Sequence, residues 1–176
     1  LVGSEMCIRD SLIGIASGIL ASIILSGFEA QLQAVTALAL FIPIIGGTGG
    51  NVGVQASAIV VQGLANGSLD IREFSRQLGK EFLIGLLNAS VITSVILVYN
   101  LIVMPSQLAV TLSVAVSLFV VVMFATILGT VVPLTLEKLH INPALATGPF
   151  IQISNDIVGL LIYVGISTWF LHVFGL

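Results

Sequence analysis

The sequence predicts an all-α protein that crosses a membrane several times. Hydrophobic residues make up 57% of the 176 residues and charged residues only 7%, whereas a soluble domain carries about 25% charged residues. The mean hydropathy of +1.20 points the same way. The few charges and turn-forming residues separate apolar stretches, and each stretch is near the roughly 20 residues that a helix needs to cross a bilayer. We therefore predict a polytopic membrane protein with five transmembrane helices.

Charge and cysteine content exclude several classes of protein. A net charge of -3 with five basic residues provides no clustered basic face for nucleic acid. The single Cys7 cannot form an internal disulfide, and no His/Cys cluster has the spacing of metal ligands. Catalysis within the membrane would need a second carboxylate or a Ser/His pair at matching depth, and His140 and His172 both lie near span ends. We therefore predict that the protein is not an enzyme.

The first eleven residues, LVGSEMCIRDS, differ from the rest of the chain. They resemble the translated sequencing-adapter tail that caps some reading frames assembled from environmental DNA. They are not a signal peptide, because the one basic residue, Arg9, stands beside Asp10 and no small-residue cleavage site follows a short apolar core. We interpret residues 1–11 as a non-native leader and residues 12–176 as a membrane domain, and we expect the natural protein to be longer.

Polar connections divide the membrane domain into five predicted spans. These are Leu12 to Phe28, Ala34 to Leu64, Phe82 to Met104, Leu108 to Leu136 and Pro143 to Leu171. The second stretch is too long for one straight span at about 1.5 Å per residue. Because a glycine cluster divides it, we expect this span to be broken or tilted.

The basic residues predict the orientation, since short cytoplasmic loops are enriched in Lys and Arg. Arg72, Arg76 and Lys80 lie between the second and third spans, and Lys138 lies between the fourth and fifth. With five spans, these two connections fall on the same side of the membrane. The opposite connections contain no Lys or Arg. We therefore predict an amino end inside the cell and a carboxyl end outside, in the cell membrane.

Asp156 lies near the middle of the fifth span, in an otherwise uncharged stretch. Inserting an Asp at the membrane centre costs about 2.5 to 3.5 kcal/mol, so by default such a residue marks an ion path. Together with Asp156, the residues Gly148, Gln152, Gly159 and Tyr163 form a series spaced three or four residues apart along one helical face. The carboxylate is therefore expected on a stripe of polar or small side chains that faces protein or water.

Nearby residues extend this polar zone. Ser154 and Asn155 widen it, and Pro149 is expected to disturb the helix before Asp156 and free the carbonyl of Leu145. The alternative is that Asp156 only hydrogen-bonds to a neighbouring helix, but a neutral Asn would do so without the cost of a charge. A proton relay is the other alternative, but such relays usually use several titratable groups, and we expect no second buried acid, Lys or His to accompany Asp156.

The segment PIIGGTGGNVGVQ, within the second span, is the other distinctive feature. Its glycines are Gly46, Gly47, Gly49, Gly50 and Gly53. Three of them recur at helical spacing, which lets another helix approach closely, and this packing interpretation is preferred. The alternative is that the consecutive glycines let the backbone leave helical geometry and point carbonyls or amides into a cavity. Asn51 and Gln55, one turn apart, are placed to present amides to a hydrated ion.

The chemistry of the ligand follows from the number of carboxylates. One carboxylate per chain is too little to hold a hard dication, but a two-fold axis beside the fifth span would bring two copies of Asp156 together. Mg²⁺ keeps several waters and is usually held by one or two carboxylates, whereas Ca²⁺ takes about six to eight oxygens. A paired site suits hydrated Mg²⁺, although composition does not choose among Mg²⁺, Mn²⁺ and Co²⁺.

Two segments, FIPIIGGTGGNVGVQ and NPALATGPFIQISNDIVGLLIY, occur in this order with a basic loop following the first. They resemble the membrane domain of the MgtE magnesium channel family, over about residues 12–176. The resemblance implies a homodimer in membrane lipid, with the pore along the dimer axis. It implies that Asp156 binds hydrated Mg²⁺, helped by the backbone carbonyl of Gln152.

The resemblance also implies that Asn51 lines the pore and that Gly148 lies near its cytoplasmic constriction. We add Gln55 and Asn155 to the predicted pore lining. Members of the family often have an acid where this chain has Asn142, so a regulatory Mg²⁺ contact there is in doubt. The family's amino-terminal helical domain and paired CBS domains are outside this sequence, and we expect them as regulatory cytosolic partners in the full-length protein.

We therefore predict a divalent-cation channel that passes hydrated Mg²⁺ down its electrochemical gradient into the cell. Mg²⁺ is both transported ion and ligand, with no organic cofactor. The alternatives are a Na⁺- or H⁺-coupled exchanger that uses Asp156, and a non-transporting membrane subunit. Glu29, at the predicted outer turn, is interpreted as a solvated residue, with cation collection at the outer mouth as the alternative.

Overall fold

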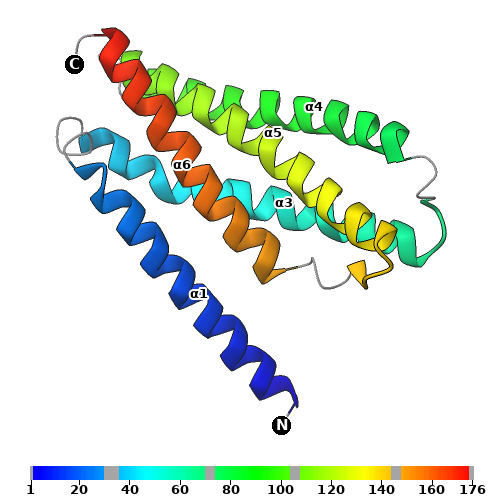
Figure 1. The fold of residues 1–176 in the computed structure, drawn as a ribbon. Coiled ribbons are helices and arrows are strands. Elements are labelled where there is room, and N and C mark those ends of the chain that lie inside the picture. Colours follow the sequence, from blue (N-terminus) through cyan, green and yellow to red (C-terminus); the bar gives the residue numbers. More distant parts are fainter. Residues whose placement is uncertain (1, 30–35, 70–73, 104–107, 144–147, 175–176) are drawn as a thin grey trace.

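The computed structural model describes residues 2–29, 36–69, 74–103, 108–143 and 148–174. In chain order the elements are α1 (Val2–Ser26), the 3-10 helix η1 (Thr36–Phe41), α3 (Ile42–Ala65), α4 (Phe74–Val103), α5 (Leu108–Lys138) and α6 (Pro149–Phe174) (Figure 1). The described ranges contain no strand, which confirms the all-α class.

Four helical segments are long and apolar enough to cross a membrane. They are Thr36–Ala65, Phe74–Val103, Leu108–Lys138 and Pro149–Phe174. The chain is therefore a multi-pass membrane protein. The apolar part of α1, Ser11–Ser26, is shorter, so the count of five spans and the direction of the termini stay predictions. α1 also runs without a break through residues 2–11, and the interpretation of those residues as a leader stays a prediction.

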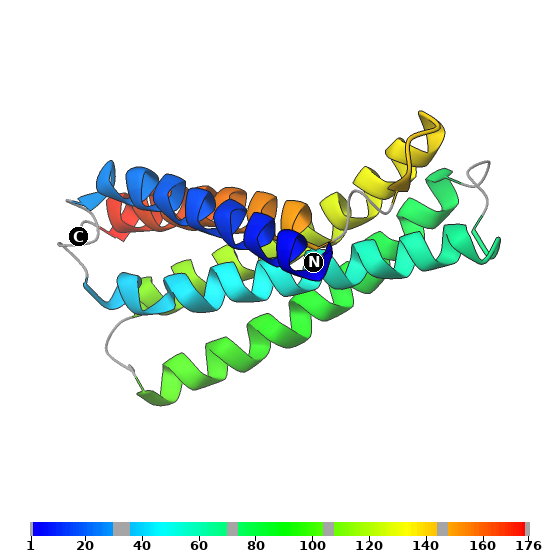
Figure 2. The same ribbon diagram turned by 90° about the horizontal axis from the view of Figure 1, so that it is seen from below.

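α5 is the central helix of the bundle. It packs against α3, α4 and α6, and in Figure 2 it lies between α4 on one side and the pair formed by α1 and α6 on the other. In its most apolar window 67% of the residues are buried, compared with 17% for α4. Leu118, Val121 and Val122 of α5 are almost completely buried in the core. α4 is therefore a peripheral helix that leaves most of its apolar side chains exposed.

The second predicted span changes from a 3-10 helix to an α-helix after Phe41, and it does not break at the glycines. η1 covers its first part, and α3 then runs continuously through the whole glycine segment. Pro43 lies in the first turn of α3, where its missing N–H has no helical partner to lose. Leu38 and Phe41 of η1 are buried, and the hydroxyl of Tyr163 on α6 donates a hydrogen bond of 2.7 Å to the Leu38 carbonyl. The 3-10 helix is thus attached to the core by a side chain of another helix.

Two helix boundaries differ from those expected. α4 begins at Phe74, so Glu81 lies inside a helix rather than in the polar connection. α6 begins at Pro149 rather than Pro143, because Gly148 has a left-handed backbone with φ of 69° and proline favours the first helical position. The expectation that Pro149 disturbs a continuous helix is therefore wrong. Leu145, whose carbonyl we expected to be freed, lies outside the described residues.

The basic residues of α4 and α5 lie at one end of the bundle. The end of α3, the start of α4 and the end of α5 lie at the same end of the bundle (Figure 1). Arg76, Lys80 and Lys138 therefore lie at one end, as alternating spans require, while Arg72 lies outside the described residues. Glu29 follows α1 at the opposite end and its side chain is exposed.

Candidate functional site

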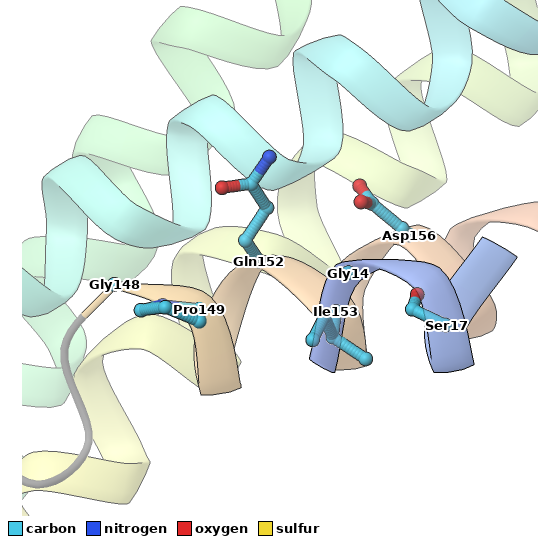
Figure 3. A pocket seen from close by; sticks show the side chains of 7 residues that line it. All are labelled: Gly14, Ser17, Gly148, Pro149, Gln152, Ile153 and Asp156. Atoms are coloured by element: carbon cyan, nitrogen blue, oxygen red, sulfur yellow. The ribbon is translucent and has the colours of Figure 1, made fainter. Parts of the chain in front are cut away.

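A cavity of about 480 Å³ lies beside the first half of α6 (Figure 3). Its walls come from α6, from the residue that precedes α6, and from α1. The lining residues are Gly14, Ser17, Gly148, Pro149, Gln152, Ile153 and Asp156. A water occupies about 30 Å³ in the liquid, so the cavity has room for an ion together with a shell of water.

The carboxylate of Asp156 points from α6 toward the glycine face of α3 (Figure 3). A Cβ atom added at Gly50 would lie 2.8 Å from Oδ1 of Asp156 and 3.1 Å from Cγ of Gln152. A Cβ at Gly46 would lie 3.9 Å from the same Oδ1. Because neither glycine has a side chain, the acid fits against the backbone of α3. The glycine segment thus makes space for the carboxylate while remaining helical.

The carboxylate of Asp156 has no counter-charge among the described residues. Its side chain is half-buried, and the described part of the chain gives it neither a hydrogen bond nor an ion pair. The residues that line the cavity include no Lys, Arg or His. A charge held among apolar helices without a partner is unfavourable unless a cation or a proton joins it. The site is therefore suited to a cation that arrives from outside the protein.

The backbone carbonyl of Gln152 lies one turn before Asp156 on α6. Helix geometry directs this carbonyl toward the amide of the residue four positions later, which is Asp156 itself. The Gln152 amide donates a 3.1 Å bond to the Gly148 carbonyl and closes the first turn of α6. A helical carbonyl uses one of its two lone pairs for the helix. The second lone pair of the Gln152 carbonyl is therefore not used by the helix, and its role as an ion ligand stays a prediction.

Asn155 lies on a different face of α6. It is 1% exposed and packs against Gly53 of α3, where any Cβ atom would meet its amide. Neither its Oδ1 nor its Nδ2 has a hydrogen-bond partner among the described residues. The side chain is thus buried between helices and does not line the cavity that holds Asp156.

The family model of MgtE, described as a divalent cation transporter, matches residues 42–166. That segment is most of the chain and contains both the glycine face of α3 and Asp156. The chain belongs to the MgtE family. It is 37% identical to the magnesium transporter MgtE of Thermus thermophilus over 160 residues, which are 91% of this chain and 35% of that protein.

Two other MgtE proteins give a similar result. The magnesium transporter MgtE of Bacillus subtilis is 37% identical over 155 residues, 88% of this chain and 34% of its own length. That of Enterococcus faecalis is 30% identical over 151 residues, 86% of this chain and 33% of its own length. The chain thus spans about a third of the length of the curated MgtE proteins that it matches.

The structure brings together some of the residues that the MgtE resemblance and the spacing predicted. Asp156, Gln152 and Gly148 line one cavity. Asn51, on α3, is exposed and is not among the residues that line it. Gln55 lines a second cavity, between α3, α4 and α5. The predicted site is therefore divided over several faces of one chain, and the roles of Asn51, Gln55 and Asn155 in a pore stay predictions.

Three residues near the two cavities were not predicted. Gly14 and Ser17 of α1 close one side of the Asp156 cavity (Figure 3). Glu81 is 6% exposed, a buried acid that the sequence did not lead us to expect, and it lines the second cavity rather than that of Asp156. The signal for its burial is the spacing of Glu81, Gly85 and Ala89, which fall at four-residue intervals on the buried face of α4. The packing face of α4 therefore extends into the segment before Phe82, which we had expected to be a polar connection.

Proposed function

We propose that this chain forms the pore of a membrane protein that transports Mg²⁺. The half-buried Asp156 carboxylate, with no counter-charge from the described residues and set against Gly50 of α3, carries the proposal. The MgtE relatives are named magnesium transporters. Asp156 is the cation ligand, and the backbone carbonyl of Gln152 assists it.

The ligand set favours an ion that keeps its water. One carboxylate and one carbonyl supply far fewer oxygens than a dehydrated dication requires, and Mg²⁺ gives up water reluctantly. The cavity of about 480 Å³ is large enough for the ion with its shell. Asp156 then contacts the waters that surround the Mg²⁺ ion and does not coordinate the ion directly. Selection would act on the size and charge of the hydrated ion.

The working unit is a homodimer. Gln152, Leu161 and Trp169 leave part of α6 exposed on the surface of a single chain. A two-fold axis beside α6 would place two Asp156 carboxylates around one ion, which is the number that Mg²⁺ sites commonly use. The pair would supply the charge that one chain lacks.

The electrochemical gradient drives the ion into the cell. The basic end of the bundle, with Lys80 and Lys138, faces the cytoplasm by the positive-inside rule. A membrane potential contributes about 2.3 kcal/mol per charge per 100 mV, which for a dication is substantial. The protein therefore acts as a channel rather than as a pump.

Uptake by liposomes that contain the purified protein tests this function. We expect Mg²⁺ entry, read with an internal indicator, that follows an imposed membrane potential when no Na⁺ or proton gradient is present. Flux that requires such a gradient would identify a coupled exchanger instead. Absence of flux would identify a non-transporting subunit. Light scattering on the same sample reports oligomeric state, and flux from a purely monomeric sample would contradict the dimer.

A further inference from the structure

Glu81 is in an unexpected position for an acidic residue. It is the one acid in the described part of the chain whose side chain belongs to the buried class, at 6% exposure. It lies on the face of α4 that packs against the bundle, near the end where α3 finishes and α4 begins (Figure 1). This position is separate from the cavity that holds Asp156.

The hydrogen bond to Glu81 does not neutralise its charge. Nε2 of Gln77, one turn earlier on α4, donates to Oε1 of Glu81 at 2.9 Å. This donor is a neutral amide. A buried carboxylate with only a neutral partner still requires a cation or a proton.

A second cavity, of about 210 Å³, adjoins Glu81 between α3, α4 and α5. Its lining includes four polar side chains, which are Gln55, Glu81, Asn88 and Thr126, and no Lys, Arg or His. The remaining lining residues are apolar. Both amides carry a carbonyl oxygen that can turn toward the cavity. Carboxylate, amide and hydroxyl oxygens are the ligands of hard cations such as Mg²⁺ and Ca²⁺.

The hydroxyl of Thr126 completes this set as an acceptor. The hydroxyl donates a hydrogen bond of 2.9 Å to the carbonyl of Val122 on the same helix. The lone pairs of Oγ1 therefore remain available to a ligand. Gly85 holds α4 close to this point, because a Cβ there would come within 3.0 Å of the Thr126 side chain. The carboxylate of α4 and the hydroxyl of α5 therefore line the same small cavity.

We propose that Glu81, Gln55, Asn88 and Thr126 form a second divalent-cation site. At about 30 Å³ per water, a cavity of about 210 Å³ is close to the volume of one ion with its first water shell. Glu81 supplies the charge, and the amide and hydroxyl oxygens contact the ion or its waters. This site does not depend on the pore function proposed for Asp156.

Mn²⁺ binding to the whole 176-residue chain in lipid nanodiscs, followed by electron paramagnetic resonance, tests the proposal. The Asp156→Asn variant serves as background, so that the Glu81 site is observed alone. Adding Glu81→Gln is expected to weaken the remaining Mn²⁺ binding by roughly tenfold or more, as the loss of a metal's supporting carboxylate does. The matched control adds Glu137→Gln, an acid at the same end of the bundle that lines neither cavity, and binding should be unchanged.

Equal Mn²⁺ affinity in Asp156→Asn with and without Glu81→Gln would overturn the proposal. If instead Asp156→Asn leaves Mn²⁺ binding as in the wild type while Glu81→Gln weakens it, the pore assignment fails and the Glu81 site stands. Mg²⁺ should displace the bound Mn²⁺. Displacement by Na⁺ at the same concentration would show a site for monovalent cations and contradict a divalent one.

Neighbouring variants separate a cation site from a structural hydrogen bond. Asn88→Ala is expected to weaken Mn²⁺ binding by about fivefold, because one oxygen contact is lost. Gln77→Ala should leave an appreciable Mn²⁺ affinity, because the Gln77 amide donates a hydrogen bond to Glu81 and supplies no ligand. Unchanged binding in Asn88→Ala would overturn the ligand set. An infrared band of a protonated carboxyl that Glu81→Gln abolishes and saturating Mg²⁺ does not would show that a proton occupies the site, and would also overturn the proposal.

Discussion

Gly50 of α3 lies against the carboxylate of Asp156 on α6, so closely that a Cβ at position 50 would be 2.8 Å from Oδ1. The two residues are far apart in the sequence and belong to helices that pack side by side. The absence of a side chain at one position is what accommodates the charge at the other. The glycine is therefore part of the candidate ion site, although it supplies no ligand.

Gly50→Ala is predicted to impair transport because the new methyl group displaces the Asp156 carboxylate and Gln152. Overpacking at a close contact costs about 1 to 3 kcal/mol, and if half of that acts on ion binding the Mg²⁺ flux falls by roughly two- to thirteenfold. Gly47→Ala is the control, since a Cβ at Gly47 meets nothing within 4 Å. Liposome uptake of both variants provides the measurement. An equal loss of Mg²⁺ flux in both variants would mean that the replacement of any glycine in α3 is responsible, and not the contact with Asp156.

Tyr163→Phe is predicted to loosen the attachment of η1 to α6. The variant removes the 2.7 Å hydrogen bond to the Leu38 carbonyl, and Tyr163 is fully buried. The expected loss is about 1 to 2 kcal/mol in the free energy of unfolding. The control is Tyr99→Phe, because the Tyr99 side chain is 50% exposed. Unfolding in detergent measures both, and a loss no greater for Tyr163→Phe than for Tyr99→Phe would argue against this role.

Gly148→Ala is predicted to destabilise the start of α6. Gly148 has a φ of 69°, and a residue with a Cβ pays roughly 1 to 2 kcal/mol for that conformation. Gly79→Ala on α4 is the opposite case, since it has open space around the new methyl group and should gain helix propensity of about 1 kcal/mol. Thermal unfolding of the two variants should therefore shift in opposite directions. A stabilised Gly148→Ala would show that this backbone conformation is not required.

Much of the fold follows from hydropathy. The apolar stretches and polar connections predicted the helical class, and the fourth predicted span and α5 begin at the same residue, Leu108. The boundary at Pro149 differed because proline is compatible both with a disturbed helix and with a helix start, and only the left-handed backbone at Gly148 decides between them. Local sequence does not specify that backbone angle.

The candidate site was predicted less completely, because its surroundings come from several helices. The charge of Asp156 in an apolar stretch was visible in the sequence, as was the glycine face. Gly14 and Ser17 occur in an ordinary apolar helix, and nothing local indicates that they meet α6. Glu81 was assigned to a loop because charged neighbours surround it. Its burial is set by the close packing of Gly85 against Thr126, which is a tertiary contact.

The most direct test of the account is Mg²⁺ uptake by liposomes that contain wild type, Asp156→Asn or Asp156→Ala, at matched protein content and with Glu137→Gln as a control for the loss of an acid elsewhere. If Asp156 is the ligand of the hydrated ion, both Asp156 variants should lose most of the Mg²⁺ flux, and the Glu137 variant should keep it. Mg²⁺ flux that is equal in the wild type and in both Asp156 variants would contradict the assignment of Asp156.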